Sequence, residues 1–384
     1  MINETSQSVL VSAGEASGDL YASLLVRELQ SRWPEAQFFG CTGPRLREAG
    51  VETVVASESL AVVGLVEVLA HIPRIYGEYK KLLAAVRERK PALAILTDSP
   101  DFHLRVARKV ALMGIPVVYL VAPQVWAWRQ GRTRQMRRDL AKLLCIFPFE
   151  EAFFRKHGVP AVYIGHPLVE RVKPTLSKSE FFAKHDLPKD RPLIVLLPGS
   201  RRGESLRHIP ALQEAVRIMG SHHGPAHFLL PASANTGAAF FRELVKGSAI
   251  QVIDGESWDA IAHADLALAA SGTVTVEAAL LGTPMVTFYK VNPVSWLLGK
   301  ALVKIPFYCM VNLIAERKIV PELMQDEMTG ENLAEQAALI LKDSGQMRKD
   351  LAEVRAKLRF SGSAIGRAAD EVMSVREARV VEVH

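Results

Sequence analysis

The chain has 384 residues, of which 49% are hydrophobic and 23% are charged. This length suits two domains of about 100 to 200 residues each, and the composition excludes a largely disordered chain. The net charge of +6 favours an anionic partner, and nucleic acid, a phosphorylated substrate and an anionic lipid surface all fit.

The chain has only three cysteines, which are widely separated: Cys41, Cys145 and Cys309. They predict neither a disulfide framework nor a zinc site. Residues 1–15 lack a basic segment followed by an apolar one, so we expect no secretory signal and a cytoplasmic protein. The most apolar stretch, residues 60–72, is interrupted by Glu67 and His71 and is shorter than the ~20 apolar residues of a membrane span.

Short apolar runs alternate with longer helical patterns from residue 8 onward, which indicates βαβ units and parallel sheets. The first series of expected strands covers 8–13, 36–41, 92–97, 116–122, 142–147 and 161–165. A second series covers 192–198, 226–231, 250–254, 265–271 and 284–289. We therefore predict an α/β fold of two tandem Rossmann-like, doubly wound domains.

Domain boundaries are expected near residues 168 and 345. The first domain would cover 1–168 and the second 169–345, and a helical segment over 346–384 would pack on an N-terminal domain. Open parallel sheets bind ligands beyond the carboxyl ends of their strands. Two such domains that face each other would therefore form a binding cleft between them.

The first strand runs into SAGEASGDLYASLL, residues 12–25. Gly14 and Gly18 permit a close backbone approach, and the helix that follows presents N–H groups to a ligand. Glu15 and Asp19 place negative charge at this turn, so it is not a dinucleotide fingerprint. A carboxylate at Glu15 suits sugar hydroxyls better than phosphate, and the alternative is a plain tight turn.

The second series opens with PLIVLLPGSRRGE, residues 192–204, in which a strand ends and a helix begins at about Glu204. Backbone N–H groups near Gly199 and Ser200, together with the guanidinium of Arg201, predict a diphosphate site. The alternative is a surface turn with solvated arginines.

The same arrangement recurs in residues 265–289, where a strand is followed by Ser271, Gly272 and Thr273 and then by a helix that contains Glu277. Four residues make about one helical turn, so Glu277 and Thr273 share a helix face. Glu277 could then bond ribose hydroxyls while the helix N-terminus faces phosphate. Two such loops predict a nucleoside diphosphate site.

In ALAILTDSPDFHLRVAR, residues 92–108, a buried strand ends at Thr97 and Asp98. A carboxylate at this position can reach a substrate hydroxyl and act as the general base of an inverting glycosyl transfer. The alternative is that Asp98 or Asp101 caps the next helix, and capping is the role that we expect for Asp101.

Aromatic and basic residues are mixed in residues 121–140. Besides Trp126 and Trp128, this tract holds Arg129, Arg132, Arg134, Arg137 and Arg138. Helical spacing would place several arginines on one side, where they suit phosphate or lipid head groups. A nucleic-acid surface and a solvated helix face are the alternatives.

Residues 60–90 open with an apolar stretch and close with a basic one, a pattern that can form an interfacial membrane helix. The alternative is a buried crossover helix. The candidate membrane contacts are Val62, Val63, Leu65, Val66 and Leu69.

Seven blocks of the chain resemble the lipid-A-disaccharide synthase family: SAGEASGD, TDSPDF, APQVWAWR, IGHPLVE, LLPGSR, SGTVTVEAALLGTPMV and VPELMQ. The resemblance implies a GT-B architecture and an inverting reaction with neither a metal nor another cofactor. The implied donor is UDP-2,3-diacylglucosamine and the implied acceptor is 2,3-diacylglucosamine 1-phosphate. The products would be a β-1,6-linked disaccharide phosphate and UDP.

The resemblance also assigns roles to individual residues. Asp98 becomes the candidate base, Arg201 the diphosphate contact and Glu277 the ribose contact. It adds Asn312, Glu322 and Gln325 to the nucleotide side. Together with the residues of the loops described above, the predicted donor side, in the C-terminal domain, comprises Gly199, Ser200, Arg201, Ser271, Gly272, Thr273, Glu277, Asn312, Glu322 and Gln325. The predicted acceptor side, in the N-terminal domain, comprises Gly14, Glu15, Ser17 and Asp101. Val311 stands where the family usually has proline, and His103 where asparagine is common.

Acylated substrates favour the interfacial interpretation of residues 60–72, which implies peripheral association with an anionic inner membrane. The family further implies a homodimer and no nucleic-acid partner. Competing interpretations are another GT-B enzyme, either a lipid-linked N-acetylglucosaminyltransferase or a UDP-sugar epimerase, and a non-enzymatic binder of RNA or lipid.

Overall fold

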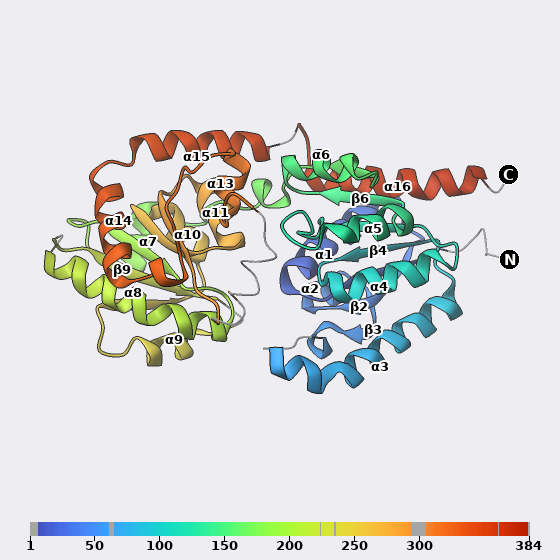
Figure 1. The fold of residues 1–384 in the computed structure, drawn as a ribbon, viewed down its shortest axis with the longest axis horizontal. Helices are drawn as coiled ribbons and strands as arrows, with labels where there is room; N and C mark the ends of the chain where they lie inside the picture. Colours follow the sequence, from blue (N-terminus) through green and yellow to red (C-terminus); the bar gives the residue numbers. More distant parts are fainter. Residues whose placement is uncertain are drawn as a thin grey trace. The chain divides into compact units, whose positions relative to one another are not determined.

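The structure is a computed structural model that describes residues 7–60, 65–222, 224–233, 236–292, 296, 305–359 and 361–382. The chain divides into two compact units. Unit 1 comprises Met1–Pro167 and Phe360–His384, and unit 2 comprises Leu168–Arg359. Each unit contains one parallel sheet with helices on both faces (Figure 1), which confirms the predicted α/β, GT-B-like class.

Unit 1 contains a seven-stranded sheet with the order β3-β2-β1-β4-β5-β6-β7. The strands are β1 (Ser8–Ala13), β2 (Gln37–Thr42), β3 (Glu52–Ala56), β4 (Leu93–Thr97), β5 (Val117–Leu120), β6 (Lys142–Cys145) and β7 (Ala161–Tyr163). The direction of winding reverses between β1 and β4, which pair in parallel with Ala13 opposite Thr97. The residues that follow these two strands are therefore neighbours at the carboxyl edge, where such sheets bind ligands.

The helices of unit 1 are α1 (Ala16–Arg32), α2 (Pro44–Glu48), α3 (Leu65–Arg89), α4 (Pro100–Ala111), α5 (Thr133–Asp139), α6 (Pro148–Lys156) and α16 (Ala364–Glu382). Helices α1 and α16 contact each other on one face of the sheet, and α3, α4 and α5 contact one another in sequence on the other face (Figure 1).

Unit 2 contains a six-stranded parallel sheet with the order β10-β9-β8-β11-β12-β13. Its strands are β8 (Leu193–Leu197), β9 (His227–Ala232), β10 (Ile250–Asp254), β11 (Leu266–Ala270), β12 (Met285–Tyr289) and β13 (Glu322–Met324). Here the reversal lies between β8 and β11, which pair in register with Ala269 opposite Leu197. The loops that follow these strands are again adjacent.

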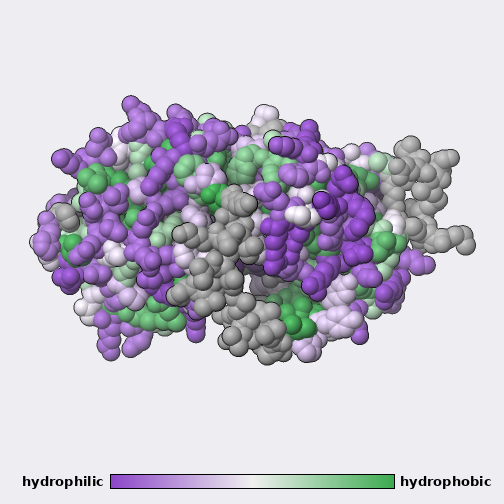
Figure 2. Space-filling view, viewed as in Figure 1, coloured by the Kyte–Doolittle hydropathy of each residue, from purple (hydrophilic) through white to green (hydrophobic). Residues whose placement is uncertain are grey.

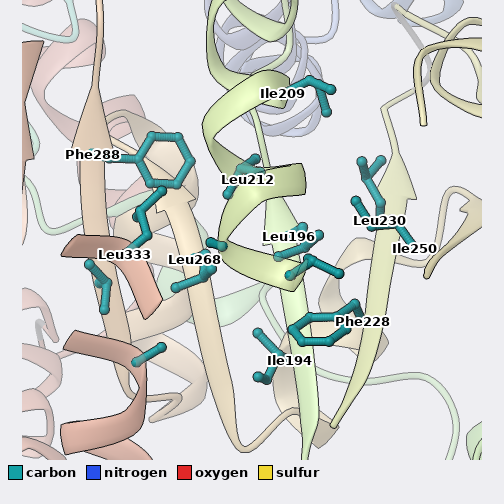
Figure 3. Packing of buried hydrophobic residues seen from close by; sticks show 14 of the residues in the cluster. Ile194, Leu196, Ile209, Leu212, Phe228, Leu230, Ile250, Leu268, Phe288 and Leu333 are labelled. Atoms are coloured by element: carbon teal, nitrogen blue, oxygen red, sulfur yellow. The ribbon is translucent and has the colours of Figure 1, made fainter. Parts of the chain in front are cut away.

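The helices of unit 2 are α7 (Lys178–Lys184), α8 (Arg202–His222), α9 (Ala238–Leu244), α10 (Ser257–His263), α11 (Thr273–Leu281), α13 (Met310–Ala315), α14 (Gly330–Lys342) and α15 (Gly345–Leu358). Side chains of α8, α14 and the sheet interdigitate in the core, with Leu212 and Leu333 opposite Leu268 (Figure 3). Strands buried on both faces need continuous apolar sequences, which is why LAILT and LIVLL were recognisable as strands.

Two strands were not expected from the sequence. β3 begins with exposed Glu52 and Thr53 at the edge of its sheet, so its sequence lacks the apolar run of a buried strand. β13 has only three residues, and all three are partly exposed. Both are edge strands, which the criterion of continuous burial does not detect.

Residues 346–384, expected as one helical segment, hold two helices in different units. α15 contacts α11 and α13 of unit 2, whereas α16 contacts α1, β5 and β6 of unit 1. The tract of residues 121–140 also differs from expectation, because its helical part is limited to η2 (Gln130–Arg132) and the seven-residue α5. Trp126 and Trp128 lie in the loop before them.

Hydrophilic residues cover most of the surface seen in Figure 2, and hydrophobic residues form small separate groups. None of the described helices is long and apolar enough to cross a membrane. Of the candidate membrane contacts, Val62 and Val63 lie outside the described residues. Leu65, Val66 and Leu69 belong to α3, but the structure describes only their backbone and not their side chains.

Candidate active site

Asp98 follows β4 at the reversal point of the unit 1 sheet and turns its carboxylate toward the loop that follows β1. Oδ1 accepts a hydrogen bond from the Gly14 N–H at 2.8 Å, and Oδ2 accepts one from the Glu15 N–H at 3.0 Å. The Asp98 side chain keeps 12% of its surface exposed. It is therefore held in a fixed orientation while a substrate hydroxyl can still reach it.

Gly14 and Gly18 allow this close approach. A Cβ atom at Gly18 would lie 1.7 Å from Asp98 Oδ2, and one at Gly14 would lie 2.5 Å from Ser99 Oγ. Both glycines are needed because the Asp98–Ser99 turn rests on the backbone of the β1–α1 loop. The sequence singled out these glycines for ligand approach, and the structure shows that an internal carboxylate occupies the space beside them.

The backbone at Asp98 has positive φ, +53°, and so has Ser99, +36°, a conformation that costs non-glycine residues energy. Two buried side chains bond the Asp98 carbonyl oxygen: the Tyr119 hydroxyl donates to it at 2.5 Å and His103 Nδ1 donates at 3.0 Å. His103 Nε2 in turn lies 2.7 Å from Ser12 Oγ. Sequence reasoning missed Tyr119, which reads as an ordinary residue of a buried strand.

The tautomer of His103 follows from these contacts. A carbonyl can only accept, so Nδ1 carries the proton, and burial lowers the pKa of His103 to about 4, which keeps the ring neutral at physiological pH. Nε2 therefore accepts from the Ser12 hydroxyl. The ring thus links β1 to the Asp98 turn.

Burial raises the pKa of Asp98 to about 7, although the hydrogen bonds from the Glu15 and Gly14 amides oppose this shift. A base with a pKa near the working pH combines a sizeable ionised fraction with a strong driving force for proton uptake. Among the candidate acceptor residues, Glu15 and Ser17 are exposed at the start of α1.

Two acidic residues behave differently from expectation. Asp19 does not crowd the loop: its buried carboxylate accepts from the N–H groups of Gly43, Arg45 and Leu46 and so caps α2. Asp101 does not cap α4, because the N-cap position is Ser99. Its exposed carboxylate instead pairs with Arg129 and Arg132.

In unit 2, β8 runs into Gly199, Ser200 and Arg201, and α8 begins at Arg202, two residues earlier than predicted. Gly199 has φ +113°, and a Cβ there would lie 2.9 Å from Glu204 Oε2. The exposed Arg201 guanidinium lies 3.4 Å from Glu204 Oε1. Glu204 also accepts from the Tyr289 hydroxyl at 2.9 Å.

His208 holds the loop that follows β8 in place through its two ring nitrogens. Its Nδ1 donates to the Pro198 carbonyl at 2.8 Å and its Nε2 accepts from the Lys290 N–H at 3.0 Å, so the ring is neutral, and burial lowers its pKa. The contact ties the loop after β8 to the end of β12. Sequence reasoning gave no role to His208, because the bond to Lys290 spans 82 residues.

The second loop of unit 2 begins at Ser271, and α11 begins at Thr273, as the spacing predicted. Gly272 and Thr273 are exposed at this helix start. Glu277 lies one turn further along, and burial raises its pKa to about 7. Since β8 and β11 are neighbours, the two loops lie side by side at one edge of the sheet.

The structure corrects the role that the resemblance gave to Asn312, which was a contact on the nucleotide side. Its Nδ2 donates to the Val320 carbonyl at 3.0 Å and to Glu322 Oε1 at 2.7 Å, and its Oδ1 accepts from the N–H groups of Ile319 and Val320. An amide side chain has two donors and two acceptor lone pairs, so its capacity is fully used. This fully buried side chain holds the chain in shape and has no bond left for a nucleotide.

Glu322 and Gln325 also make internal contacts. Glu322 accepts from the N–H groups of Tyr308 and Cys309 at 2.9 and 3.0 Å, and Ser271 Oγ donates to the Tyr308 carbonyl at 3.1 Å. Gln325 bonds both backbone groups of Val291. Glu322 thus supports the loop at Ser271 through Tyr308, whereas Gln325 holds the chain that follows β12.

Among the residues that the structure describes, no group of three or more histidine, cysteine or acidic side chains is arranged to hold a metal ion.

A family model described as lipid-A-disaccharide synthetase matches residues 9–374 of the chain. A protein of Solibacter usitatus described as lipid-A-disaccharide synthase is 65% identical over 378 residues, which cover 98% of this chain and 99% of that protein. A protein of Acidobacterium capsulatum with the same description is 40% identical over 97% of this chain and 98% of its own length.

Solved structures resemble the chain at low sequence identity. The glycotransferase of kitacinnamycin superposes with a TM-score of 0.64 at 16% identity and covers 96% of this chain and 98% of its own. UDP-GlcNAc 2-epimerase from Neisseria meningitidis, bound to UDP-GlcNAc, gives a TM-score of 0.62 at 12% identity over 97% of this chain and 100% of its own. These similarities establish the fold.

Proposed function

We infer the roles of the site residues from the premise that the chain belongs to the lipid-A-disaccharide synthase family. Its activity is therefore that of a lipid-A-disaccharide synthase, a glycosyltransferase. We propose that the donor is UDP-2,3-diacylglucosamine and the acceptor 2,3-diacylglucosamine 1-phosphate. The observation that carries the site assignment is the Asp98 carboxylate, held by two backbone amides at the reversal point of its sheet.

In the proposed reaction, the Asp98 carboxylate takes the proton of the acceptor 6-hydroxyl. The hydroxyl oxygen attacks the anomeric carbon of the donor from the face opposite the diphosphate. The bond from that carbon to the diphosphate oxygen breaks, and UDP leaves with the electron pair. Protonated Asp98 then releases its proton to solvent. A positioned base accelerates such a step by about 10²- to 10⁴-fold.

The donor is assigned to unit 2. The backbone N–H groups near Gly199 and Ser200 and the Arg201 guanidinium would bind the diphosphate and balance its growing negative charge. The start of α11 at Thr273 would face the same diphosphate, and Glu277 would accept from the ribose hydroxyls. Asn312 and Glu322 would contribute indirectly, because they position the loop at Ser271 through Tyr308. Gln325 would hold the chain that follows β12 at Val291.

We also propose that the N-terminal part of α3 lies on an anionic membrane. Ile72 and Tyr76 are 50% and 55% exposed, and the Lys80 ammonium lies 4.5 Å from the Tyr76 ring centre, an aromatic and cationic combination suited to the head-group region. In a liposome flotation assay, replacing Val66 and Leu69 with serine should move the protein from the floating membrane fraction to the dense bottom fraction, where unbound protein stays. Unchanged partitioning of the folded variant would contradict the proposal.

The resemblance leads us to propose a homodimer as well. Light scattering behind size-exclusion chromatography would report a mass near 42.3 kDa for a monomer and twice that for the dimer. A single monomeric species across the working concentration range would rule the dimer out.

The catalytic assignment is tested by UDP release with purified acceptor. Asp98→Asn should lower kcat by about 10²-fold or more without loss of UDP binding, whereas Asp190→Asn, which alters an exposed carboxylate paired with Arg191, should leave kcat unchanged. Full activity of Asp98→Asn would remove Asp98 as the base. Conversion of UDP-GlcNAc without an acceptor would instead indicate an epimerase.

A further inference from the structure

Arg129 and Arg132 converge on a single carboxylate beside the candidate base. Arg129 Nη1 lies 2.9 Å from Asp101 Oδ1, and Arg132 Nη2 contacts the same oxygen. Asp101 lies in the first turn of α4, three residues after Asp98 in the sequence. We call Arg129 and Arg132 the arginine pair.

The loop that carries the arginine pair is held in place from beneath. The Trp126 indole donates to buried Glu150 at 3.1 Å, and Gln130 Nε2 donates to the Trp126 carbonyl at 3.0 Å. The Arg129 guanidinium lies over the Trp128 ring, 4.1 Å from its centre. A stacked guanidinium in a fixed loop loses little further freedom when it binds an anion.

The charges of this group do not balance. Two guanidinium groups face one carboxylate, which leaves one net positive charge among these three side chains. Figure 2 shows hydrophilic residues over α4 and α5 on this face. The Asp101 side chain is 65% exposed while Arg132 is only 22% exposed. Because exposed ion pairs contribute little free energy, the carboxylate can give way to a stronger anion. A phosphate monoester carries more charge and matches two guanidinium groups with paired hydrogen bonds.

The pair also lies close to the Asp98 turn. The Tyr119 hydroxyl donates to the Asp98 carbonyl. Burial raises the pKa of Tyr119, and the charges of Asp98, Arg132, Glu15 and Asp101 also influence it. Arg132 and Asp101 are therefore close enough to the Tyr119 hydroxyl, and so to the Asp98 turn, to influence the pKa of Tyr119. An acceptor with its hydroxyl at Asp98 would have the rest of its sugar near the arginine pair.

We propose that Arg129 and Arg132 bind the phosphate monoester of the acceptor and thereby position its hydroxyl at Asp98. Asp101 holds the arginine pair in place and is displaced by the phosphate. Asp101, predicted as an acceptor-binding residue, would thus act on the acceptor only through the arginine pair. The proposal rests on the proposed function, since that function supplies an acceptor with a phosphate.

The test compares the 1-phosphate acceptor with the same acceptor from which the phosphate has been removed, in neutral detergent micelles. Arg132→Gln and Arg129→Gln should each raise KM for the phosphorylated acceptor by about 10- to 100-fold, the range of one charge-assisted hydrogen bond. KM for the donor should not change. With the dephosphorylated acceptor, the variants and the wild type should have the same kcat/KM.

Arg138→Gln is the matched control, because Arg138 is an exposed arginine of the same segment that pairs with Asp139; it should leave both acceptors unaffected. An equal loss with both acceptors, or no change in KM for the phosphorylated acceptor, would overturn the proposal.

Two further measurements distinguish this proposal from lipid binding by the arginine pair and from the assignment of Asp98 as the base. Cosedimentation with phosphatidylglycerol vesicles should be the same for Arg132→Gln and the wild type. If vesicle binding falls while KM in micelles does not, the arginine pair binds lipid head groups and the proposal is wrong. Asp98→Asn should lose turnover with both acceptors. If that variant stays active, the base is misassigned, while the phosphate-dependent change in KM would still be observed.

Discussion

A single methyl group at Gly18 should displace the candidate base. The Cβ of Gly18→Ala would lie 1.7 Å from Asp98 Oδ2 and 2.7 Å from its Cγ, so the carboxylate would have to move by roughly 2 Å to restore van der Waals contact. That movement breaks the bonds to the Gly14 and Glu15 amides. Since Gly18 lies within α1, where alanine is favoured over glycine by about 1 kcal/mol, the variant should still fold.

The expected result is a fall in kcat of about 10²-fold or more, the lower end of the contribution of a positioned base, with KM for the donor within about twofold. Steady-state UDP release gives both constants, and thermal unfolding followed by circular dichroism checks the fold. The matched control is Gly220→Ala in α8, where the added Cβ would meet no atom within 4 Å beyond its chain neighbours and the backbone of its own helix. A folded Gly18→Ala enzyme with wild-type kcat would refute the placement of Asp98 as the base.

Three other outcomes are expected. Because burial raises the pKa of Asp98 to about 7 and the base acts when deprotonated, kcat/KM should fall tenfold per pH unit below about 7 and level off above it; a profile flat down to pH 5 would contradict this. Arg201→Ala should lower kcat about 10²- to 10³-fold, as loss of a charge-stabilising donor does, and isothermal titration should show weaker UDP binding; unchanged kcat would exclude its role. Asn312→Ala should lower the free energy of unfolding by about 2–4 kcal/mol, because it leaves buried backbone groups unpaired; urea denaturation would show it, and a midpoint equal to that of the wild type would refute the supporting role.

The sequence was informative where a feature is local. Buried strands such as LAILT are continuous apolar runs, so the end of β4, and with it Asp98, could be located. The start of α11 at Thr273 was visible from its glycine and the helical pattern that follows. The parallel sheets followed from the alternation of such runs with helices.

Long-range contacts could not be read in the same way. The bond between Gly14 and Asp98 spans 84 residues and exists because β1 and β4 are neighbours, which depends on strand order. Asp101 is of a residue type and position that are typical of a helix cap. Its partners, Arg129 and Arg132, nevertheless lie about 30 residues later in the chain. Asn312 was assigned to the nucleotide by resemblance, and only its four internal bonds reveal that it supports the loop.

The packing of α16 on α1, β5 and β6 has a consequence for biosynthesis. Unit 2 is inserted between the two segments that build unit 1, so a ribosome completes residues 168–359 before it delivers the helix that covers the first sheet. Buried Ala368, Ala369 and Val372 of α16 are the last apolar groups to reach their places. Until then, the apolar surface of unit 1 that α16 covers stays exposed in the nascent chain, and such exposed apolar surface is what chaperones bind.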